Sequence, residues 1–583
     1  MPKIDRRSLL TSALGAGSAA VVCRRPAFGD TQAGSIQQSV LDAYRGKRGS
    51  IVIPRGTYQI APPPRAGSHL NFHDMADFEI DARGVNFVFT DVTLGGIEFV
   101  NCRAVHLHGA TIRHEVPPFT QGTVESIAPD RTWYTLRIDA GYPKNFDDPK
   151  YFPAAPLGCL FDAKTRRLKS GISDIGARKV ERLSGSVFRL YGGGAESVGD
   201  LAAFRGSGRP GITLMNCSQM DIRDVTIHNS GMFGVLESRG EGRNHYSVTI
   251  QRGAPQSGAR TDPLYSTCAD GLHSTSMRKG PVLENCSFEG MPDDGIAIHG
   301  IYSLVLKGAG DRLVINKSSF QAGDPLFLFD VAGSPAGEAV VRSVTPAPDF
   351  NNTRQSQRTT VANNTAGPYF EIALDRRLSA DFDYLCSNPA ALGSGYILRN
   401  NTIQNHRARG MLLKAHNGLV EGNTIDGSST SGIVVSPELW WNEACYSRNV
   451  IIRNNTVRNL PDNPRSYGAI LVAAVANQYV PVPGYGHQHI VLEGNQIENI
   501  NGVNLLITSA QDVTVRNNRF INAQRVTRPA GGAKWGEDPG ALIYITEAKD
   551  VRIEGNSVSG LGPANRRLVQ TTSTATQIQS DWK

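Results

Sequence analysis

The chain has 583 residues, of which 19% are charged, and its formal net charge is +7. Five basic residues and one acidic residue within 1–29 supply +4 of that charge, which leaves +3 on the remainder. Because no basic run is interleaved with aromatic residues, this composition argues against nucleic-acid binding. No segment is apolar enough to span a bilayer. The seven cysteines after Cys23 are too scattered to suggest a zinc site.

Residues 1–29 are expected to be a twin-arginine-type export signal. Arg6 and Arg7 precede a mildly apolar stretch that runs to Val22, and Ala27-Phe28-Gly29 offers a small-x-small cleavage site. An ordinary secretory signal is the alternative. Either signal predicts a periplasmic or secreted protein.

Residues 30–116 are predicted to form an N-terminal cap and the first coils of a repeat protein. The segment SIQQSVLDAYRG, from Ser35, has the pattern of a short helix, which can cover the open end of a solenoid and prevent edge-to-edge pairing. The coils are expected to begin near Phe78, where the alternating segment FEIDARGVNFVF starts.

A repeated pattern, apolar-x-apolar-x-Asn/Gly-Asn-x-apolar, runs through much of the chain. Its shortest intervals are 22 residues, from 396 to 418, and 23 residues, from 490 to 513. Alternation places Ile, Val and Leu on one face of short strands, and Asn and Gly suit the corners between them. Because such strands bury their apolar face only by stacking, with Asn side chains in ladders, the pattern predicts an all-β fold, a parallel β-helix. Eight segments carry it, beginning at Met220, Pro281, Tyr396, Gly418, Val450, Ile490, Val513 and Val551.

Two segments lack the repeat and are interpreted as small β-barrel or β-sandwich modules inserted into the solenoid. Residues 117–207 contain GTVESIAPDRTWYTLRID and KVERLSGSVFRLYG, which predict antiparallel hairpins. Residues 304–392 contain LVINKSSF and YFEIALDRRLS, which read as strands. Coils with an acidic site are expected in 208–303, and further coils and a tail in 393–583. Large inserts on one face often frame a binding site.

Three carboxylates stand about one repeat apart, Asp270 in one coil and Asp293 and Asp294 in the next. Stacking brings them together, at ~4.8 Å for neighbouring rungs or roughly 7–8 Å for diagonal ones. Three like charges this close cannot all ionise easily, so at least one pKa should rise, which places a proton donor beside a carboxylate base. This combination suits glycoside hydrolysis, and spacing alone does not choose between inversion and retention. The alternatives are aspartates that cap coil corners and a calcium site. We expect no metal and no cofactor.

Five further residues are candidates for sugar binding. His273 and His299 follow the acidic motifs at outward-facing positions and can hydrogen-bond sugar hydroxyls. Trp441 can stack on a sugar ring, Glu443 can accept hydrogen bonds from hydroxyls, and Arg409 can orient a carboxylate or a hydroxyl. A purely structural role is the alternative for each of them.

These motifs resemble those of glycoside hydrolase family 110, the exo-acting α-galactosidases. The resemblance spans most of residues 35–560, and the acidic motifs are its most specific part. It implies a right-handed parallel β-helix interrupted by two small β-barrel modules, an inverting mechanism, and catalytic roles for Asp270, Asp293 and Asp294. It does not say which of them is the acid. The matching segments are Pro118-Phe119-Thr120-Gln121-Gly122, Ala269-Asp270-x-x-His273, Asp293-Asp294, Ile298-His299-Gly300, Arg409-Gly410, Trp441-x-Glu443 and Arg448-Asn449-Val450.

The sequence therefore predicts an exported glycoside hydrolase that removes terminal α-linked galactose from an oligo- or polysaccharide. One alternative is a pectin-degrading polygalacturonase or polysaccharide lyase on the same fold. The Gly-His-Gly and Arg-Ile-Lys motifs of family 28 are missing, however, and no basic constellation suits a lyase. Another alternative is a non-catalytic carbohydrate-binding β-helix. Sugar linkage, aglycone and oligomeric state are left open.

Overall fold

The computed structural model describes residues 33–172, 174–255, 258–356, 365–439, 441–462, 467–475, 480–526 and 535–582. The predicted export signal, residues 1–29, lies outside these ranges. Among the helices that the structure describes, none is long and apolar enough to cross a membrane.

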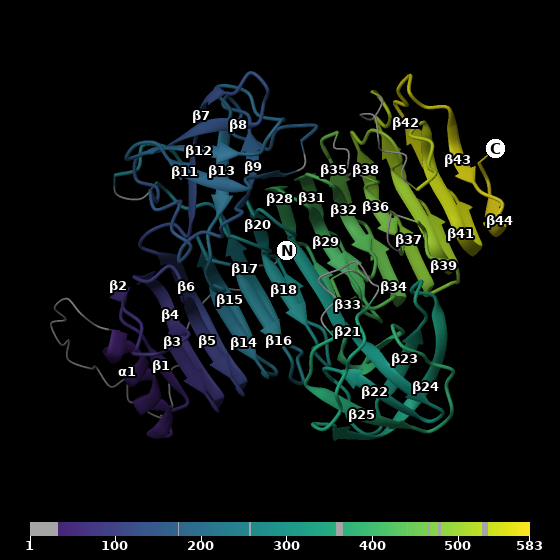
Figure 1. Ribbon diagram of the computed structural model, residues 1–583, viewed down its shortest axis with the longest axis horizontal. Helices are drawn as coiled ribbons and strands as arrows, with labels where there is room; N and C mark the ends of the chain where they lie inside the picture. Colours follow the sequence, from purple (N-terminus) through teal and green to yellow (C-terminus); the bar gives the residue numbers. More distant parts are fainter. Residues whose placement is uncertain are drawn as a thin grey trace, which may run out of the picture. The chain divides into compact units, whose positions relative to one another are not determined.

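The predicted parallel β-helix is confirmed, and strands of successive coils pair in three parallel columns (Figure 1). Long strands run around a corner and join two columns. The first column comprises β1 (Ser50–Val52), β4 (Ala76–Phe89), β6 (Arg103–His114), β15 (Asp221–Ile227), β17 (His245–Ile250), β19 (Val282–Glu284), β27 (Ile397–Arg399), β30 (Leu419–Glu421), β34 (Arg448–Arg453), β37 (His487–Glu493), the ends of β39 (Leu505–Arg516) and β41 (Ala541–Glu554), and β44 (Thr576–Ser580). The second comprises β2 (Gly56–Ile60), the ends of β4, β6, β15 and β17, then β20 (Ser287–Glu289), β28 (Thr402–His406), β31 (Thr424–Ser428), β35 (Thr456–Arg458), β38 (Gln496–Glu498), β40 (Arg519–Ile521) and β42 (Ser557–Ser559).

The third column lines, with its outer face, the largest part of the cavity described below as the candidate active site. It comprises β3 (Ser68–His73), β5 (Gly95–Val100), β14 (Ile212–Met215), β16 (Val235–Ser238), β18 (Leu272–Thr275), β21 (Ile296–Ala309), β29 (Arg409–Leu413), β32 (Ser431–Val435), β36 (Ile470–Val472), β39 (Leu505–Arg516), β41 (Ala541–Glu554) and β43 (Arg567–Thr571).

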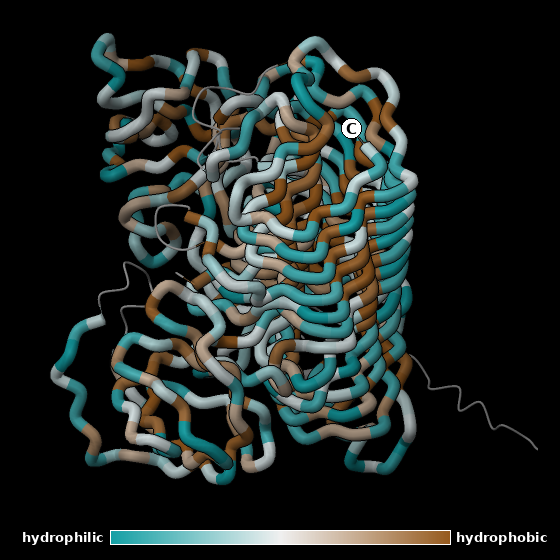
Figure 2. The backbone as a smooth tube through the Cα atoms, turned by 90° about the vertical axis from the view of Figure 1, so that its right-hand side faces the viewer, coloured by the Kyte–Doolittle hydropathy of each residue, from teal (hydrophilic) through white to brown (hydrophobic). Residues whose placement is uncertain are grey.

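Apolar stacks fill the interior, and the expected asparagine ladder ties the coils together. Figure 2 shows hydrophobic positions of successive coils in line with one another. Each ladder asparagine after the first accepts, through Oδ1, hydrogen bonds from the backbone N–H and the side-chain amide of the asparagine one coil before it; for Asn423 and Asn455 both are 2.9 Å long. The ladder residues are Asn401, Asn423, Asn455, Asn495, Asn518 and Asn556. Cys286 precedes Asn401 in this stack and is buried, as are the other described cysteines, none of which forms a disulfide.

The N-terminal cap is present, but the coils begin earlier than predicted. Helix α1 (Ala33–Arg45) places Ile36, Val40 and Ala43 in the solenoid core. The expectation that coils start near Phe78 was wrong, because β1 to β3 already form a coil whose strands pair with β4 and β5. Prolines and arginines between these short strands interrupt the alternation that the sequence argument relied on. The last strands, β43 and β44, likewise lack an Asn rung.

Antiparallel strands interrupt the coils twice. A seven-stranded sheet has the order β10-β9-β13-β7-β8-β12-β11 and includes the two predicted hairpins, β7–β8 and β11–β12. Because β10 and β11 are the two edges of this order, the strands pair as an open sheet. The closed β-barrel form of the inserted modules stays a prediction. The strands are β7 (Phe119–Ile127), β8 (Trp133–Ile138), β9 (Leu157–Phe161), β10 (Ile175–Gly176), β11 (Lys179–Arg182), β12 (Val187–Tyr191) and β13 (Leu201–Arg205).

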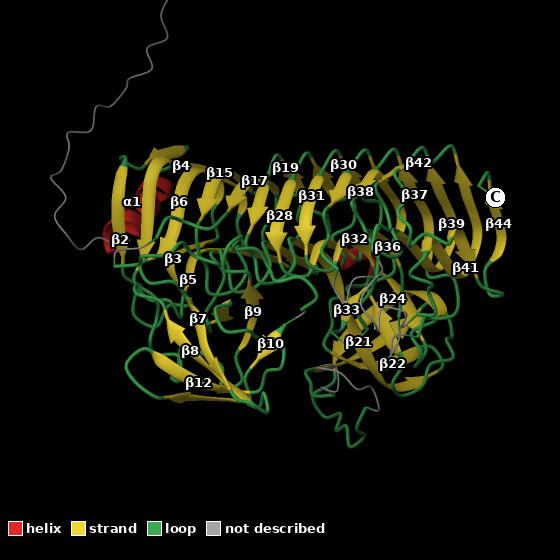
Figure 3. Ribbon diagram, turned by 90° about the horizontal axis from the view of Figure 1, so that it is seen from above, coloured by secondary structure: helices red, strands yellow, loops and turns green. Residues whose placement is uncertain are grey.

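In the second interruption, β21 leaves the third column and continues into antiparallel pairs. Figure 3 shows these strands on the same side of the coils as the seven-stranded sheet. Along the length of the solenoid, the seven-stranded sheet lies toward the N-terminal coils and the second group lies toward the C-terminal coils. The elements are β22 (Arg312–Asn316), β23 (Pro325–Phe329), β24 (Pro335–Pro346), β25 (Tyr369–Leu374), β26 (Leu385–Ser387), the 3-10 turn η2 (Pro389–Ala391) and β33 (Glu443–Ala444).

Candidate active site

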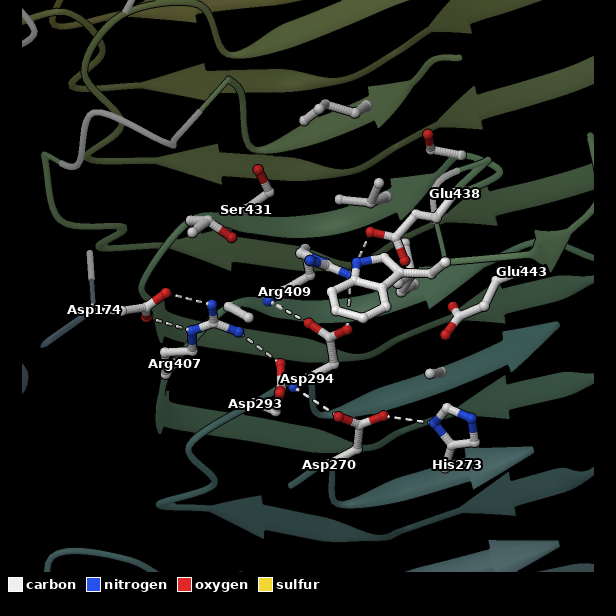
Figure 4. Close-up of a pocket in the computed structure, with 18 of the residues that line it drawn as sticks. Asp174, Asp270, His273, Asp293, Asp294, Arg407, Arg409, Ser431, Glu438 and Glu443 are labelled. Carbon is white, nitrogen blue, oxygen red and sulfur yellow. Dashed lines mark hydrogen bonds and ion pairs between the residues drawn. The ribbon is translucent and has the colours of Figure 1, made fainter. Parts of the chain in front are cut away.

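A cavity of about 560 Å³ lies over the outer face of the third column, and its volume is in the range of small-molecule sites (Figure 4). Leu157, Asp174 and Arg205 of the seven-stranded sheet and its loops line one side. Trp441 and Trp535, from loops after β32 and before β41, line other parts. The predicted carboxylates Asp270, Asp293 and Asp294 all face this cavity.

A row of stacked glycines fixes the site residues. The residues directly before these glycines lie one above another. The backbone N–H of Gly271 donates to the carbonyl oxygen of Asp294 at 2.9 Å, and the backbone N–H of Gly295 donates to the carbonyl oxygen of Arg409 at 2.9 Å. A Cβ on Gly295 would lie 2.5 Å from the carbonyl oxygen of Gly410, so only glycine lets the coils approach this closely. The residue before each glycine is thereby aimed at the cavity. In coil order these residues are Phe233, Asp270, Asp294, Arg409 and Ser431.

Asp293 is held as an anion by two arginines. Its Oδ2 accepts from Arg205 at 2.8 Å and its Oδ1 from Arg407 at 2.7 Å. Burial opposes ionisation, but the charges of Arg407, Arg205 and Arg409 outweigh it, and the pKa of Asp293 falls below its usual value. Arg407 is itself held by Asp174 through two hydrogen bonds of 2.8 Å. With both oxygens engaged, Asp293 is an anchor rather than a proton donor.

Asp294 is the strongest candidate for the acid. It is 4% exposed, and burial together with the charges of Asp270, Asp293 and Glu438 raises its pKa to about 8, although Arg409 opposes the shift. Arg409 donates its backbone N–H to Oδ1 at 2.8 Å and brings its guanidinium to 3.0 Å from Oδ2. A carboxyl group with this pKa is mostly protonated at neutral pH.

Asp270 shares a proton with His273. Nδ1 of His299 lies 2.6 Å from the carbonyl oxygen of Gly300, which only accepts, so this nitrogen carries the hydrogen. Burial lowers the pKa of His299 to about 3, so the ring is neutral and its Nε2 accepts. His273 must then donate through Nε2, 2.8 Å away. Its Nδ1 faces Asp270 Oδ2 at 2.7 Å, and the proton between them can reside on either group.

Burial alone would lower the pKa of His273, but the hydrogen bond and charge of Asp270 outweigh burial and raise it. Burial, with the charges of Asp293 and Glu443, also raises the pKa of Asp270, although His273 opposes this shift. One proton is therefore shared across the 2.7 Å contact, and Asp270 can act as a base when that proton lies on His273. The ring of Phe233 stacks on His273 at 4.3 Å and fixes its plane.

Charged residues beside the three aspartates contact one another in a chain that runs from Arg409 to His299. Arg409 donates to Glu438 at 3.1 Å, and the buried Lys414 donates to Glu438 at 2.9 Å and to Glu443. Burial would raise the pKa of Glu443, but the neighbouring histidines and Lys414 hold it well below its usual value. Glu443 Oε1 lies 3.9 Å from Nε2 of His299, which in turn contacts His273 beside Asp270.

Seven of the eight predicted site residues line the cavity. His299 does not, and instead lies behind His273 as its hydrogen-bond acceptor. Trp441 is 53% exposed at the cavity rim, as a stacking residue would be. The sequence argument missed several residues that contact the carboxylates or their partners: Asp174, Arg205, Arg407, Lys414 and Glu438. Ser431 also lines the cavity. The sequence could have indicated this, because Ser431-Gly432 repeats the pattern of a polar residue before glycine seen in Asp270-Gly271 and Arg409-Gly410.

Oxygens of Asp270, Asp293 and Asp294 lie within 4.8 Å of one another, a spacing that could also hold a cation. The three arginines around them already supply positive charge. This neutralisation makes the cluster a poorer site for calcium, whose ligands usually keep free carboxylate charge.

Comparisons with known proteins agree with the fold and the family resemblance. Residues 383–471 match the family model described as a right handed beta helix region. Alpha-1,3-galactosidase B of Akkermansia muciniphila is 24% identical over 573 residues, which cover 90% of this chain and 67% of that protein. The predicted resemblance to α-galactosidases is confirmed. Alpha-1,3-galactosidase B of Phocaeicola vulgatus is 27% identical over 504 residues, covering 78% of this chain and 80% of that protein.

Among solved structures, the catalytic domain of a GH87 alpha-1,3-glucanase in complex with tetrasaccharides aligns with a TM-score of 0.43 at 11% identity. That alignment covers 93% of this chain and 67% of the other. The similarity is too low to carry an argument about the site.

Proposed function

We propose that this protein is a glycoside hydrolase that removes terminal α-linked galactose, with Asp294 as the general acid and Asp270 as the general base. The observation that carries the proposal is the division of charge among three adjacent carboxyl groups. Asp294 is kept protonated, Asp293 is neutralised by arginines, and Asp270 shares one proton with His273 and is ionised when that proton lies on the histidine. Similarity to α-1,3-galactosidases over most of the chain supports the choice of sugar.

In this mechanism Asp294 protonates the glycosidic oxygen while Asp270 takes a proton from the attacking water. Asp293 keeps Arg205 and Arg407 in place and, through its negative charge, favours the protonated form of Asp294. While Asp270 is ionised, His273 carries a hydrogen on each ring nitrogen and donates one to Asp270 Oδ2, so the proton taken from water stays on the Asp270 carboxyl group. No cofactor takes part in the steps we propose.

We propose inversion as the stereochemical course, which the family resemblance supports. One oxygen from each of the three groups lies within 4.8 Å of the others. The ~6.5–9.5 Å typical of inverting pairs refers to whole carboxyl groups, so this contact does not choose the course. Retention would make Asp270 the nucleophile instead of the base. The anomer released first distinguishes the two.

The test is hydrolysis of α-galactosides by protein lacking residues 1–29, followed by NMR detection of the first anomer. Wild type is compared with Asp294→Asn and with Asp426→Asn, which changes an aspartate that pairs with Arg458 away from the site. We expect β-galactose first, a loss of about a thousandfold in Asp294→Asn, and full activity in the control. α-Galactose first would establish retention. No turnover of any α-galactoside would refute the substrate assignment.

We also propose that the protein is exported, because Arg6-Arg7 and the following apolar stretch have the pattern of a twin-arginine signal. Fractionation of cells that express the full chain tests this. We expect the protein outside the cytoplasm, and retention inside when both arginines are changed to lysine. Export that is unaffected by this double substitution would favour an ordinary secretory signal.

A further inference from the structure

The outer face of the first column carries a group of histidines and a carboxylate that the proposed reaction does not use. Strand β6 presents His106 and His108 on this face, whereas the alternate residues Val105 and Leu107 are buried in the solenoid core. Asp221 lies on the neighbouring strand β15, in register with His106. One ligand atom from each of His106, His108 and Asp221 lies within 4.8 Å of the others. We call these three residues the histidine cluster.

The contacts of His108 are those of a metal ligand rather than those of a hydrogen-bonded histidine. Its Nε2 lies 4.0 Å from Oδ2 of Asp221, which is too far for a hydrogen bond. This nitrogen has no hydrogen-bond partner among the described residues. The gap is about twice the length of a bond from zinc to nitrogen or to a carboxylate oxygen, ~2.0–2.1 Å. A cation between the two atoms would therefore bind both after only a small movement of the side chains.

The remaining polar atoms of the cluster are oriented as they are around bound zinc. Nδ1 of His108 faces Oε1 of Glu79 at 3.7 Å, and β4 and β15 pair on opposite sides of β6. A carboxylate in this position orients a ligating imidazole. Oδ1 of Asp221 accepts from Nε of Arg223 at 2.6 Å, which leaves Oδ2 for a metal. The rings of His106 and His108 are inclined by only 27°, so both can turn a nitrogen toward one ion.

Two imidazoles and one carboxylate are a ligand set for zinc. Zinc is bound by nitrogen, oxygen or sulfur, whereas calcium and magnesium take oxygen ligands. His245 lies in register with Asp221 one coil further on and can supply the fourth ligand of a tetrahedral site. The donor types therefore favour Zn²⁺ over the cations that bind oxygen alone.

The charges beside the histidine cluster favour a cation. Glu79 and Asp221 bring two negative charges to it, and Arg223 brings one positive charge. Asp81 and Arg83, both on β4, pair with each other at 2.6 Å and cancel. The balance is negative, so a divalent ion would be attracted and not repelled.

The histidine cluster joins two coils that the first insert separates in the chain. β6 ends at His114, directly before the inserted sheet, and β15 belongs to the coil that follows it. The two strands nevertheless pair side by side (Figure 1). We propose that the histidine cluster binds one Zn²⁺ ion, which fixes the coil before the first insert to the coil after it. The cavity lies over the third column, so this inference does not depend on the proposed glycosidase activity.

Calorimetric titration with Zn²⁺, after treatment of the purified protein with EDTA, tests the inference. Loss of a group that orients a metal ligand weakens binding 10–100-fold, so we expect loss of a ligand in His108→Gln to cost at least about tenfold in affinity. Asp221→Asn, which keeps the size of the side chain, should give a similar loss. The matched control is His489→Gln, because His489 lies on β37 of the same column and pairs with Asp512. It should bind Zn²⁺ as wild type does.

Thermal unfolding gives a second measurement that does not depend on activity. Zinc at a hundredfold excess over its Kd should raise Tm by about 2 °C for a protein of this size. We expect this rise in wild type and in His489→Gln, and no rise in His108→Gln or Asp221→Asn, whose circular dichroism should match that of wild type. Failure of wild type to bind Zn²⁺ would overturn the inference. Equal binding in both ligand variants would also overturn it, because the ion would then lie elsewhere, such as at the carboxylates of the cavity.

Discussion

Asp294 is the residue that sets the alkaline limit of the proposed reaction. Burial first, and then the charges of Asp270, Asp293 and Glu438, raise its pKa to about 8. An acid must be protonated to act, so kcat/KM should fall as the pH rises through about 8. Asp293→Asn removes one negative neighbour, which lowers the pKa of Asp294 and moves this fall to lower pH. The pH dependence of kcat/KM in the two proteins is the measurement.

An alkaline limit that stays in place in Asp293→Asn would show that another group than Asp294 is the acid. Asp426→Asn is the matched control, since Asp426 pairs with Arg458 and faces no cavity residue. Its profile should coincide with that of wild type.

In the proposed mechanism, His299 acts through His273, which it contacts at 2.8 Å. His299→Leu removes the acceptor, so the Nε2 hydrogen of His273 loses its partner and the ring can adopt the other tautomer. A lost buried hydrogen bond costs about 1–3 kcal/mol, and we expect kcat to fall at least tenfold with a smaller change in KM. The acidic limb of the pH profile should also move. His416→Leu is the control, because His416 is a partly buried histidine that donates to a carbonyl outside the cavity.

A merely structural role for His299 would give a different result. Both histidine variants would then lose stability alike, and the kcat of His299→Leu per folded molecule would match that of wild type with an unchanged pH profile.

At the scale of the element, the stacked glycines determine where the acid lies. In Gly295→Ala the new Cβ would meet the carbonyl oxygen of Gly410 at 2.5 Å and the side chain of Ile403 at 2.6 Å. The strand must shift, which displaces Asp294 beside it. We expect a loss of stability of about 1–3 kcal/mol, seen in denaturant unfolding, and a loss of activity larger than the unfolded fraction explains. Gly185→Ala, with no atom within 4 Å of its Cβ, should change neither. Unchanged activity in Gly295→Ala would mean that the stack does not position Asp294.

The elements were predictable where one repeat controls them. Asn455 and its ladder partners recur with a regular apolar alternation, so the strands around them follow from the sequence. The coil formed by β1 to β3 has no such rung and was missed. The position of Asp294 on the cavity side was not decided by alternation, because it precedes the strand at a corner. The recurrence of a polar residue before glycine, in Asp270-Gly271 and Arg409-Gly410, carries that information instead.

At the scale of the whole molecule, the cavity joins segments that no repeat relates. Arg205 is the last residue of β13 in the seven-stranded sheet, yet it contacts Asp293, 88 residues later in the chain. Asp174 contacts Arg407 across 233 residues. Neither the spacing nor the type of these residues marks them in the sequence, because an insert is placed on the coils by tertiary packing alone. Seven of the eight predicted site residues line the cavity, and all eight lie in coils or in loops between them.

The inserted sheet should therefore affect catalysis without contacting the reacting carboxylates. Asp174→Asn weakens the two hydrogen bonds that hold Arg407, and Arg407 in turn holds Asp293. Charge-assisted hydrogen bonds of this kind contribute about 1.5–3 kcal/mol, so we expect kcat/KM to fall about tenfold while thermal unfolding changes little. Asp147→Asn is the matched control, since Asp147 pairs with Arg182 within the same insert, away from the cavity. Equal activities of the two variants would show that the insert only covers the site, and a loss confined to Asp174→Asn would show that it helps to set the charge of the acid's neighbour.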